Sequence, residues 1–374
     1  MSTTRDFSRV ITRPRVILVA LIVMSWAILS FSKTEYYSVE KGSASPLVSA
    51  LTVHGVPTDA PSGKPTSSSP GFFIVDVRLE QMTLGRWLKA QVFHDVEYFP
   101  LTAIIPPGTS VGDFDRRGYL DMEQSKQTAS FVALRAAGYT VATQRGGAEV
   151  NAVRKGGPAA KVKLHVGDRI VAVDGVTTMS SCDAIRALHS RPPNTTVRLS
   201  VRRAKISSSG SITRAAPVDI AVTTSRPRRT YIADCAGVTD RPTSIIGVSL
   251  VDARTYVLPA NVSVKTDYVG GPSGGLAMAL AIYDRLTAGS LSGKHRVAVT
   301  GTISLRGHVG EIGGIGQKAR AAVDAHADTF LVPSSQAGEA KAAVGSDLRI
   351  IGVSTFTEAL RVLRDLGGSA EKLR

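Results

Sequence analysis

Cysteine is scarce in this chain, which has only two, Cys182 and Cys235, among 374 residues. Neither belongs to a CxxC pair or stands near histidines at the spacing of a zinc site, so no metal is expected. The two residues can form one disulfide in an oxidising compartment. Whether they meet in space is not determined by the sequence.

Signals for nucleotide and nucleic-acid binding are also missing. No GxxxxGK[ST] loop occurs, which excludes an ATPase of that type within this sequence. Aromatic residues are only 6% of the chain, and none of its stretches interleaves them with arginine as a nucleic-acid groove does. The net charge of +15 therefore indicates solubility or an anionic membrane surface. The dense basic run Arg226 to Arg229 is interpreted as a solvated linker, and no nucleic acid or cofactor is expected.

The N-terminal region carries a long uncharged apolar run, Val16 to Phe31, with four arginines before it. This pattern predicts a single-pass transmembrane anchor that contacts the lipid bilayer, although the run is short of the roughly 20 residues that span a membrane. A cleaved signal peptide is the alternative. The preceding arginines predict a cytoplasmic N-terminus, with everything from about Tyr36 onward extracytoplasmic at the plasma membrane.

Residues 36–140 are predicted to be a connector region of strands and helices. Two apolar stretches, Leu47 to Val53 and Phe72 to Val77, flank a loop rich in proline, glycine and serine, which favours a small hairpin. Helical spacing follows from Leu84 in LGRWLKAQVF and again over Met122 to Ala137. Gly138 is the expected end of that second helix.

From about Val141 the pattern changes to short alternating strands around one helix. The phrase VRKGGPAAKVKLHVGDRIVAVDGVTT, residues 153–178, contains the turn signals Gly-Gly-Pro, Gly-Asp and Asp-Gly. It resembles a PDZ domain of the bacterial protease type, expected over 141–225. The resemblance implies that a peptide adds as a strand beside Gly147, Ala148, Glu149 and Val150. A packing or gating role without a ligand stays open.

Two motifs nearer the C-terminus carry chemistry. In the stretch VGGPSGGLA, residues 269–277, the proline and glycines hold Ser273 at the first turn of a helix. Free amides there, those of Ser273 and Gly274, can stabilise an oxyanion. Lys318 begins another helix among alanines, and burial lowers a lysine pKa. Only a neutral amine can serve as base, which requires the pKa of the lysine to fall by roughly 3 units from about 10.4.

These motifs, 45 positions apart from Ser273 to Lys318, resemble the two signatures of the Lon proteolytic domain over about 229–370. The resemblance implies a nucleophile at Ser273, a general base at Lys318, a supporting role for Thr300 and a homo-oligomer. The common pattern is not kept at three positions, which here are Gly270, Thr302 and Gly316. With the predicted anchor and PDZ domain, the chain resembles membrane-anchored Lon-like PDZ proteases of bacteria.

The expected fold is α+β and multidomain: an N-terminal transmembrane helix within 1–35, a small β-rich region, a PDZ domain and a Lon-type α/β proteolytic domain. The expected function is ATP-independent serine endopeptidase activity on flexible or unfolded extracytoplasmic proteins, with the PDZ domain binding or gating substrate. The order of the domains, PDZ first, argues against a trypsin-like protease. The alternative is a non-catalytic, membrane-tethered PDZ adaptor with an inactive Lon-like scaffold.

Overall fold

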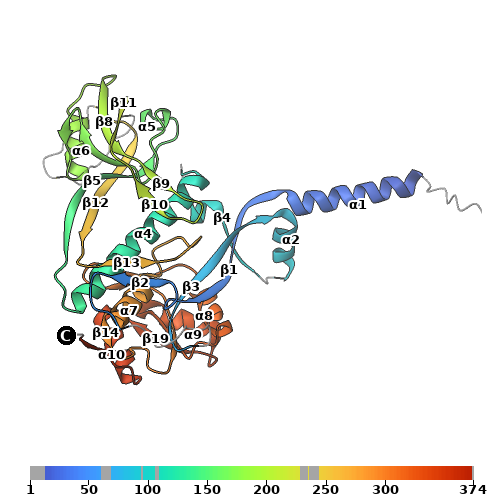
Figure 1. Cartoon of the computed structure of the whole chain (residues 1–374). Coiled ribbons are helices and arrows are strands. Elements are labelled where there is room, and N and C mark those ends of the chain that lie inside the picture. The colour runs from blue at the N-terminus through green and yellow to red at the C-terminus, as the bar shows by residue number, and fades with distance from the viewer. Residues whose placement is uncertain are drawn as a thin grey trace, which may run out of the picture. The chain divides into compact units, whose positions relative to one another are not determined.

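A computed structural model describes residues 13–59, 69–93, 96–105, 109–227, 235 and 244–372 (Figure 1). The chain divides into two compact units, Met1–Glu40 with Val77–Ile104, and Lys41–Asp76 with Ile105–Arg374. Part of the predicted basic linker, from Arg228 onward, lies outside the described residues.

The first unit contains three helices and parts of two long strands. Its elements are α1 (Arg13–Phe31), β1 (Lys33–Pro46, as far as residue 40), β3 (Gly71–Thr83, from residue 77), α2 (Leu84–Phe93), β4 (Glu97–Pro100) and α3 (Leu101–Ile104). The helix predicted from Leu84 is confirmed as α2. Its Trp87 ring stacks on Tyr36 of β1 with centroids 5.6 Å apart, which anchors the helix on the strand.

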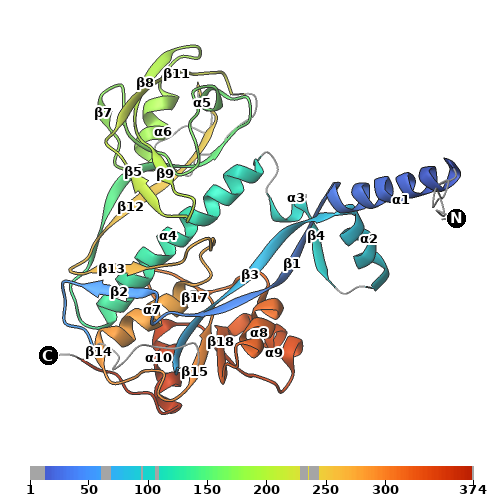
Figure 2. The same cartoon turned by 45° about the vertical axis from the view of Figure 1, so that its right-hand side comes forward.

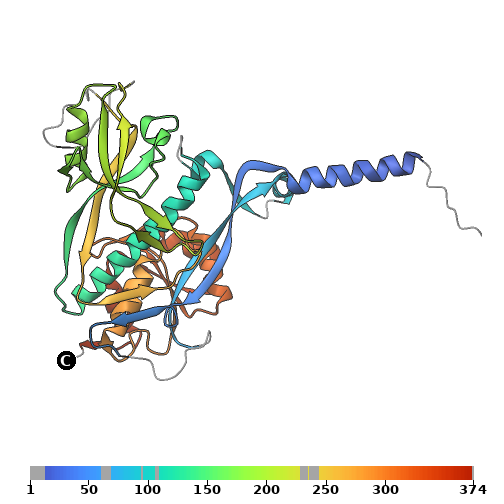
Figure 3. The same cartoon turned by 45° about the horizontal axis from the view of Figure 1, so that its top comes forward.

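The prediction of a transmembrane anchor over Val16 to Phe31 is not supported. Helix α1, blue in Figure 3, has 19 residues but begins with Arg-Pro-Arg, so its uncharged run starts only at Val16. At about 1.5 Å per residue, that run is shorter than a hydrocarbon core of about 30 Å. In the described part of the chain, we find no helix with both the length and the apolarity needed to cross a membrane.

The second unit is built on a mainly parallel sheet. Its strands lie in the order β19 (Arg349–Val353), β18 (Thr329–Pro333), β15 (Arg296–Val299), β3 and β1. The predicted hairpin between Leu47 to Val53 and Phe72 to Val77 is wrong. Strand β3 pairs parallel with β15, and β2 (Leu51–His54) pairs antiparallel with β13 (Asn261–Val264). The connector region therefore supplies strands whose partners lie about two hundred residues later.

Two packed helices of the larger core lie beside the turn that carries Ser273. Helix α7 (Gly275–Arg285) is buried from Gly275 to Tyr283, and α4 (Val111–Ala136) packs along it (Figure 2). Helix α4 starts a full eleven residues before the predicted helix at Met122, because Ser110 caps its first turn by accepting from the Asp113 amide. Gly138, with φ of 98°, ends it as expected.

The remaining elements of this half are short. They are β14 (Thr287–Ala288), β16 (Thr302–Ile303), β17 (Val309–Gly310), α8 (Ile315–Asp324), η1 (Ser334–Gln336), α9 (Ala337–Val344), α10 (Phe356–Asp365) and β20 (Glu371–Lys372). Alanines of α8 and α9 pack with Phe330 and Val332 of β18 in a separate small core. Lys318 of α8 is buried as well.

The PDZ-like part is a second sheet with two helices. The strand order is β11 (Val218–Thr223), β8 (Thr196–Arg202), β6 (Arg169–Val173), β5 (Ala142–Val153) and β12 (Val248–Val257), with β7 (Val176–Thr177) on β6. The other elements are α5 (Pro158–Lys161), α6 (Ser181–His189), β9 (Ala204–Ile206) and β10 (Ile212–Arg214). A disulfide joins Cys182 of α6 to Cys235, which resolves the question left open by the sequence.

Candidate active site

Ser273 lies on a tight turn immediately before Gly274, the N-cap of α7. The turn needs Gly271, whose φ of 87° lies in the left-handed region. Helix α4 supports the turn from the side: the Gly271 amide donates to the Gly118 carbonyl at 2.8 Å, and Ser125 Oγ donates to the Pro272 carbonyl at 3.0 Å. These α4 contacts are not predictable from the sequence, since neither Gly118 nor Ser125 stands in a recognisable motif.

The three predicted side chains meet at one point. Lys318 Nζ lies 2.7 Å from Ser273 Oγ and 3.3 Å from Thr300 Oγ1. Thr300 Oγ1 donates its own proton to the Ser273 carbonyl at 3.2 Å, so a lone pair of its oxygen faces the amine. The Gly301 amide donates to the same carbonyl at 2.8 Å and holds the end of β15 against the serine turn.

Lys318 is almost completely withdrawn from water, with 2% of its surface exposed. Burial lowers the pKa of its amine to about 8, and the negative charge of Asp76 opposes that shift. About 9% of the amine is then neutral at pH 7, against fewer than one in a thousand at an ordinary pKa near 10.4. The site therefore supplies a usable amount of free base near neutral pH.

Asp76, on β3, is a further residue of the site that the sequence motifs do not predict. Its carboxylate accepts hydrogen bonds from the Ser43 amide at 2.9 Å and the Ser43 hydroxyl at 2.8 Å. The neighbouring residue must be small, because a Cβ added at Gly42 would lie 1.7 Å from Asp76 Oδ1. No local motif marks an aspartate in a strand as the neighbour of a lysine almost 250 positions later.

The predicted oxyanion donors are available in the structure. As far as the described residues go, the amides of Ser273 and Gly274 have no hydrogen-bond acceptor. Both lie at the positive end of α7, where an oxyanion is stabilised.

Gly275 has to be glycine, because an added Cβ would lie 2.9 Å from Ser125 Oγ and 3.0 Å from the Ile303 amide nitrogen.

Two of the three departures from the Lon pattern have a steric reason. Gly270 approaches α4 so closely that an added Cβ would lie 3.2 Å from the Gly118 carbonyl carbon. A side chain such as aspartate would require the backbone to move, so glycine accompanies the close approach of α4. Gly316 also approaches a neighbouring helix, because an added Cβ would lie 3.3 Å from Ala343 Cβ of α9. Thr302 has no such explanation in the structure.

The residues predicted to bind a peptide lie on β5, but the edge of this strand is already paired. Strand β12 runs antiparallel beside it, with Val150 opposite Leu250 and Ala148 opposite Asp252. Ala148 and Val150 face the core and are completely buried. Glu149 faces the other way, and its carboxylate accepts hydrogen bonds from Arg169 at 2.9 Å and Arg214 at 3.2 Å. An incoming strand therefore finds this edge occupied by the chain itself.

Family comparisons agree with this architecture. Residues 136–213 match the PDZ domain, and residues 264–364 match the Lon protease (S16) C-terminal proteolytic domain. The chain therefore contains a PDZ domain and a Lon-type proteolytic domain, and the latter supports a peptidase.

Known relatives resemble only part of the chain. A Lon protease of Campylobacter concisus is 39% identical over 112 residues, which are 29% of this chain and 14% of that protein. A Lon protease of Neorickettsia sennetsu is 40% identical over 93 residues, 24% of this chain and 11% of that protein. The chain thus spans a small share of the curated relatives it matches. Among solved structures, the PDZ domain of an SdrC-like protein from Listeria monocytogenes is 25% identical, with 28% of this chain and 87% of that chain covered and a TM-score of 0.21.

Proposed function

We propose that this protein is a serine endopeptidase that uses Ser273 as nucleophile and Lys318 as general base. The observation that carries the proposal is the 2.7 Å contact between Ser273 Oγ and a lysine amine that is 2% exposed. A buried amine with lowered pKa accepts the serine proton as the hydroxyl attacks a peptide carbonyl. The amides of Ser273 and Gly274 stabilise the tetrahedral oxyanion.

The remaining steps follow from the same geometry. The protonated Lys318 passes its proton to the leaving amine, which leaves an acyl group on Ser273 Oγ and a neutral lysine. Lys318 then takes a proton from a water molecule as that water attacks the acyl group, and it returns the proton to Ser273 Oγ when the bond to the second product breaks. Thr300 keeps the amine directed at the serine in both half-reactions, since its oxygen accepts from Nζ at 3.3 Å.

The setting of the reaction is also part of the proposal. We place the protease domain outside the cytoplasm, with flexible or unfolded proteins as substrates, and the Cys182–Cys235 disulfide supports an oxidising compartment. Cleavage is proposed to be independent of ATP, so adding ATP and Mg²⁺ should leave the rate unchanged. A homo-oligomer is proposed by resemblance to Lon-type domains alone.

A fluorophosphonate probe tests the proposal directly. The wild-type chain should be labelled at Ser273 and should cleave unfolded casein, whereas Lys318→Ala should abolish both. Lys341→Ala, on the outer helix α9, is the matched control and should behave as wild type. Labelling that persists in Lys318→Ala would exclude the lysine as base. Absence of labelling and cleavage in the wild type would favour the non-catalytic adaptor.

A further inference from the structure

The N-terminal part of α4 is not packed into the proteolytic core. The first α4 residue that belongs to this core is Met122, and the preceding stretch Val111 to Tyr119, the outer part of α4, contains no buried residue. Gly118 lies in this outer part. Its carbonyl nevertheless accepts from the Gly271 amide at 2.8 Å, two positions before Ser273. The support that α4 gives to the serine turn at this point therefore needs an attachment outside the proteolytic core.

Arg116 supplies an attachment in the PDZ domain. Its Nε donates to the Val166 carbonyl at 2.5 Å, and its Nη2 donates to the Ala204 carbonyl. Nη2 also lies 3.8 Å from Oδ1 of Asp168, whose carboxylate is fully buried. Hydrogen bonds from a charged donor are stronger than neutral ones, and the planar guanidinium group reaches both carbonyls in one fixed geometry. Arg116 thus ties α4 to the turn before β6 and to the start of β9.

Close packing beside Arg116 reinforces this attachment. A Cβ added at Gly167 would lie 2.4 Å from Leu120 Cδ1, and one added at Gly210 would lie 2.5 Å from the Tyr119 ring. Both glycines have a positive φ, of 85° and 88°. Glycine therefore lets two turns of the PDZ domain approach the helix directly on either side of Gly118.

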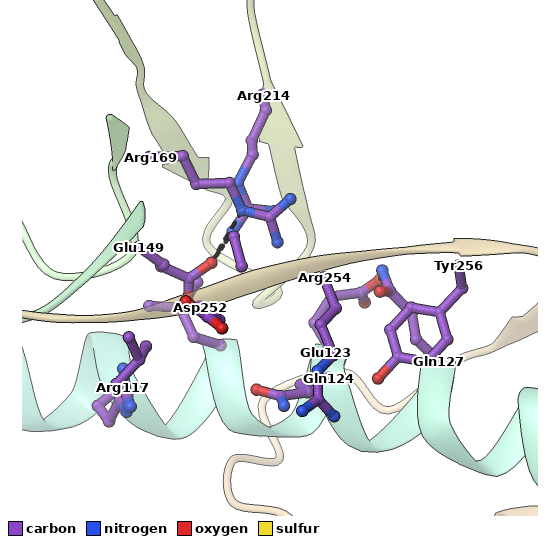
Figure 4. Close-up of a pocket in the computed structure, with 13 residues that line it drawn as sticks. Arg117, Glu123, Gln124, Gln127, Glu149, Arg169, Arg214, Asp252, Arg254 and Tyr256 are labelled. Atoms are coloured by element: carbon purple, nitrogen blue, oxygen red, sulfur yellow. Dashed lines mark hydrogen bonds and ion pairs between the residues drawn. The ribbon is translucent and has the colours of Figure 1, made fainter. Parts of the chain in front are cut away.

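The next part of α4 is separated from the PDZ sheet. Arg117 still reaches the sheet, where its Nη2 donates to Asn151 Oδ1 of β5. A cavity of about 370 Å³ then lies between β12 and α4, whose residues line it as far as Gln127 (Figure 4). The attachment of the outer part of α4 is therefore concentrated at residues 116–120, around Gly118.

A second contact joins the PDZ domain to the loop that leads to Ser273. The Ser209 carbonyl, in the turn between β9 and β10, accepts from the Tyr268 amide at 3.1 Å. Tyr268 has φ of 63°, a left-handed conformation that is unfavourable for a residue with a Cβ. The hydrogen bond from the PDZ turn helps to hold this conformation five residues before the nucleophile.

We propose that Arg116 is a positioning residue for Ser273, and that the PDZ domain holds the nucleophile in place through the outer part of α4. Without the guanidinium contacts, the Gly118 carbonyl shifts, the Gly271 amide loses its acceptor, and the serine turn moves. A displacement of about 1 Å can lower a rate by about a hundredfold. The effect on catalysis rests on the proposed function, whereas the link between Arg116 and the serine turn does not.

Amide hydrogen exchange of Gly271 tests this link without using activity. Arg116→Met keeps the apolar stem of the side chain and removes its donors. In this variant, Gly271 should exchange about tenfold faster than in wild type, because its acceptor is no longer fixed. The Gly301 amide, which donates to the Ser273 carbonyl from the end of β15, should exchange as in wild type. Arg116→Lys keeps the charge but cannot span both carbonyls with a planar group, so this milder variant should give an intermediate rate.

Arg203→Met is the matched control. Arg203 donates to the same buried carboxylate, that of Asp168, at 2.8 Å, and to the Lys163 carbonyl. Both acceptors belong to the PDZ domain, so the substitution disturbs this domain without removing a donor from α4. Gly271 should therefore exchange as in wild type.

Kinetics on a short fluorogenic peptide test the consequence for catalysis. Arg116→Met should lower kcat about tenfold with little change in KM. The pH midpoint of kcat/KM should stay the same, because the burial of Lys318 does not depend on Arg116. A fluorophosphonate should label Arg116→Met more slowly but to the same final extent as wild type, which shows that the variant is folded.

Three results would overturn the inference. Equal Gly271 exchange in wild type and both Arg116 variants would mean that Arg116 does not hold the turn. Equally fast exchange in Arg203→Met would mean that any loosening of the PDZ domain has this effect. Faster exchange with unchanged kcat would exclude a positioning role. If exchange responds as expected but wild type is not labelled by a fluorophosphonate, the protease proposal fails and the link from the PDZ domain to the turn is confirmed.

Discussion

The pH dependence of cleavage tests the protonation state of Lys318. Its pKa is lowered to about 8 by burial, and only the neutral amine can accept the Ser273 proton. The neutral fraction rises from about 9% at pH 7 to about 91% at pH 9, so kcat/KM should increase about tenfold over this range. The measurement is the initial rate on a fluorogenic peptide at substrate concentrations well below KM.

Removing the charge of Asp76 is a second test of the Lys318 pKa. Its negative charge raises the pKa of Lys318, opposing the effect of burial. Asp76→Asn should therefore shift the rise in kcat/KM to lower pH and increase the rate at pH 7. Asp324→Asn is the matched control, because Asp324 pairs at the surface with Lys41 and has no part in the site. Its profile should match wild type.

Two outcomes would refute this reasoning. A midpoint near 10 would mean that the catalytic amine is solvated, contrary to its 2% exposure. A shift to higher pH in Asp76→Asn would mean that the carboxylate does not act on Lys318 through its charge. In either case the buried-amine mechanism would fail even if Ser273 were still labelled.

Three further substitutions probe the site. Lys318→Met should abolish cleavage. It should also raise the free energy of unfolding at pH 6.5 by about 3 kcal/mol, because below pH 8 the wild-type native state contains a buried ammonium group whose desolvation is unfavourable, and methionine removes this cost. The lysine of the unfolded chain loses its proton only near pH 10.4, so the stabilisation of Lys318→Met relative to wild type should decrease between pH 8 and about 10.4. Urea denaturation of both proteins at pH 6.5 and pH 10 measures this difference. Thr300→Val should lower kcat about 10- to 100-fold with little change in KM, while Thr300→Ser retains most activity, and equal rates for both would exclude a positioning role. Ser125→Ala removes the 3.0 Å bond to the Pro272 carbonyl and should lower kcat/KM about tenfold, whereas an unchanged rate would show that the turn needs no support from α4.

The sequence alone was enough to select the residues that meet at the site. Ser273, Lys318 and Thr300 stand in short motifs whose glycines, proline and alanines have local reasons to be there. Gly271 adopts a positive φ, and the alanines of α8 belong to a buried core. Turn and helix geometry depends on neighbours within a few positions, so it can be predicted from the sequence alone.

Pairing between distant segments was decided only by the tertiary structure. The approach of Asp76 to Lys318, the support of the turn by Ser125 and the partners of β2 and β3 join positions far apart in the chain. The pairing of β12 with the edge of β5 also joins segments that are far apart in the sequence. An alternating pattern predicts that a strand exists but not which strand lies beside it, because main-chain hydrogen bonds are the same for every partner.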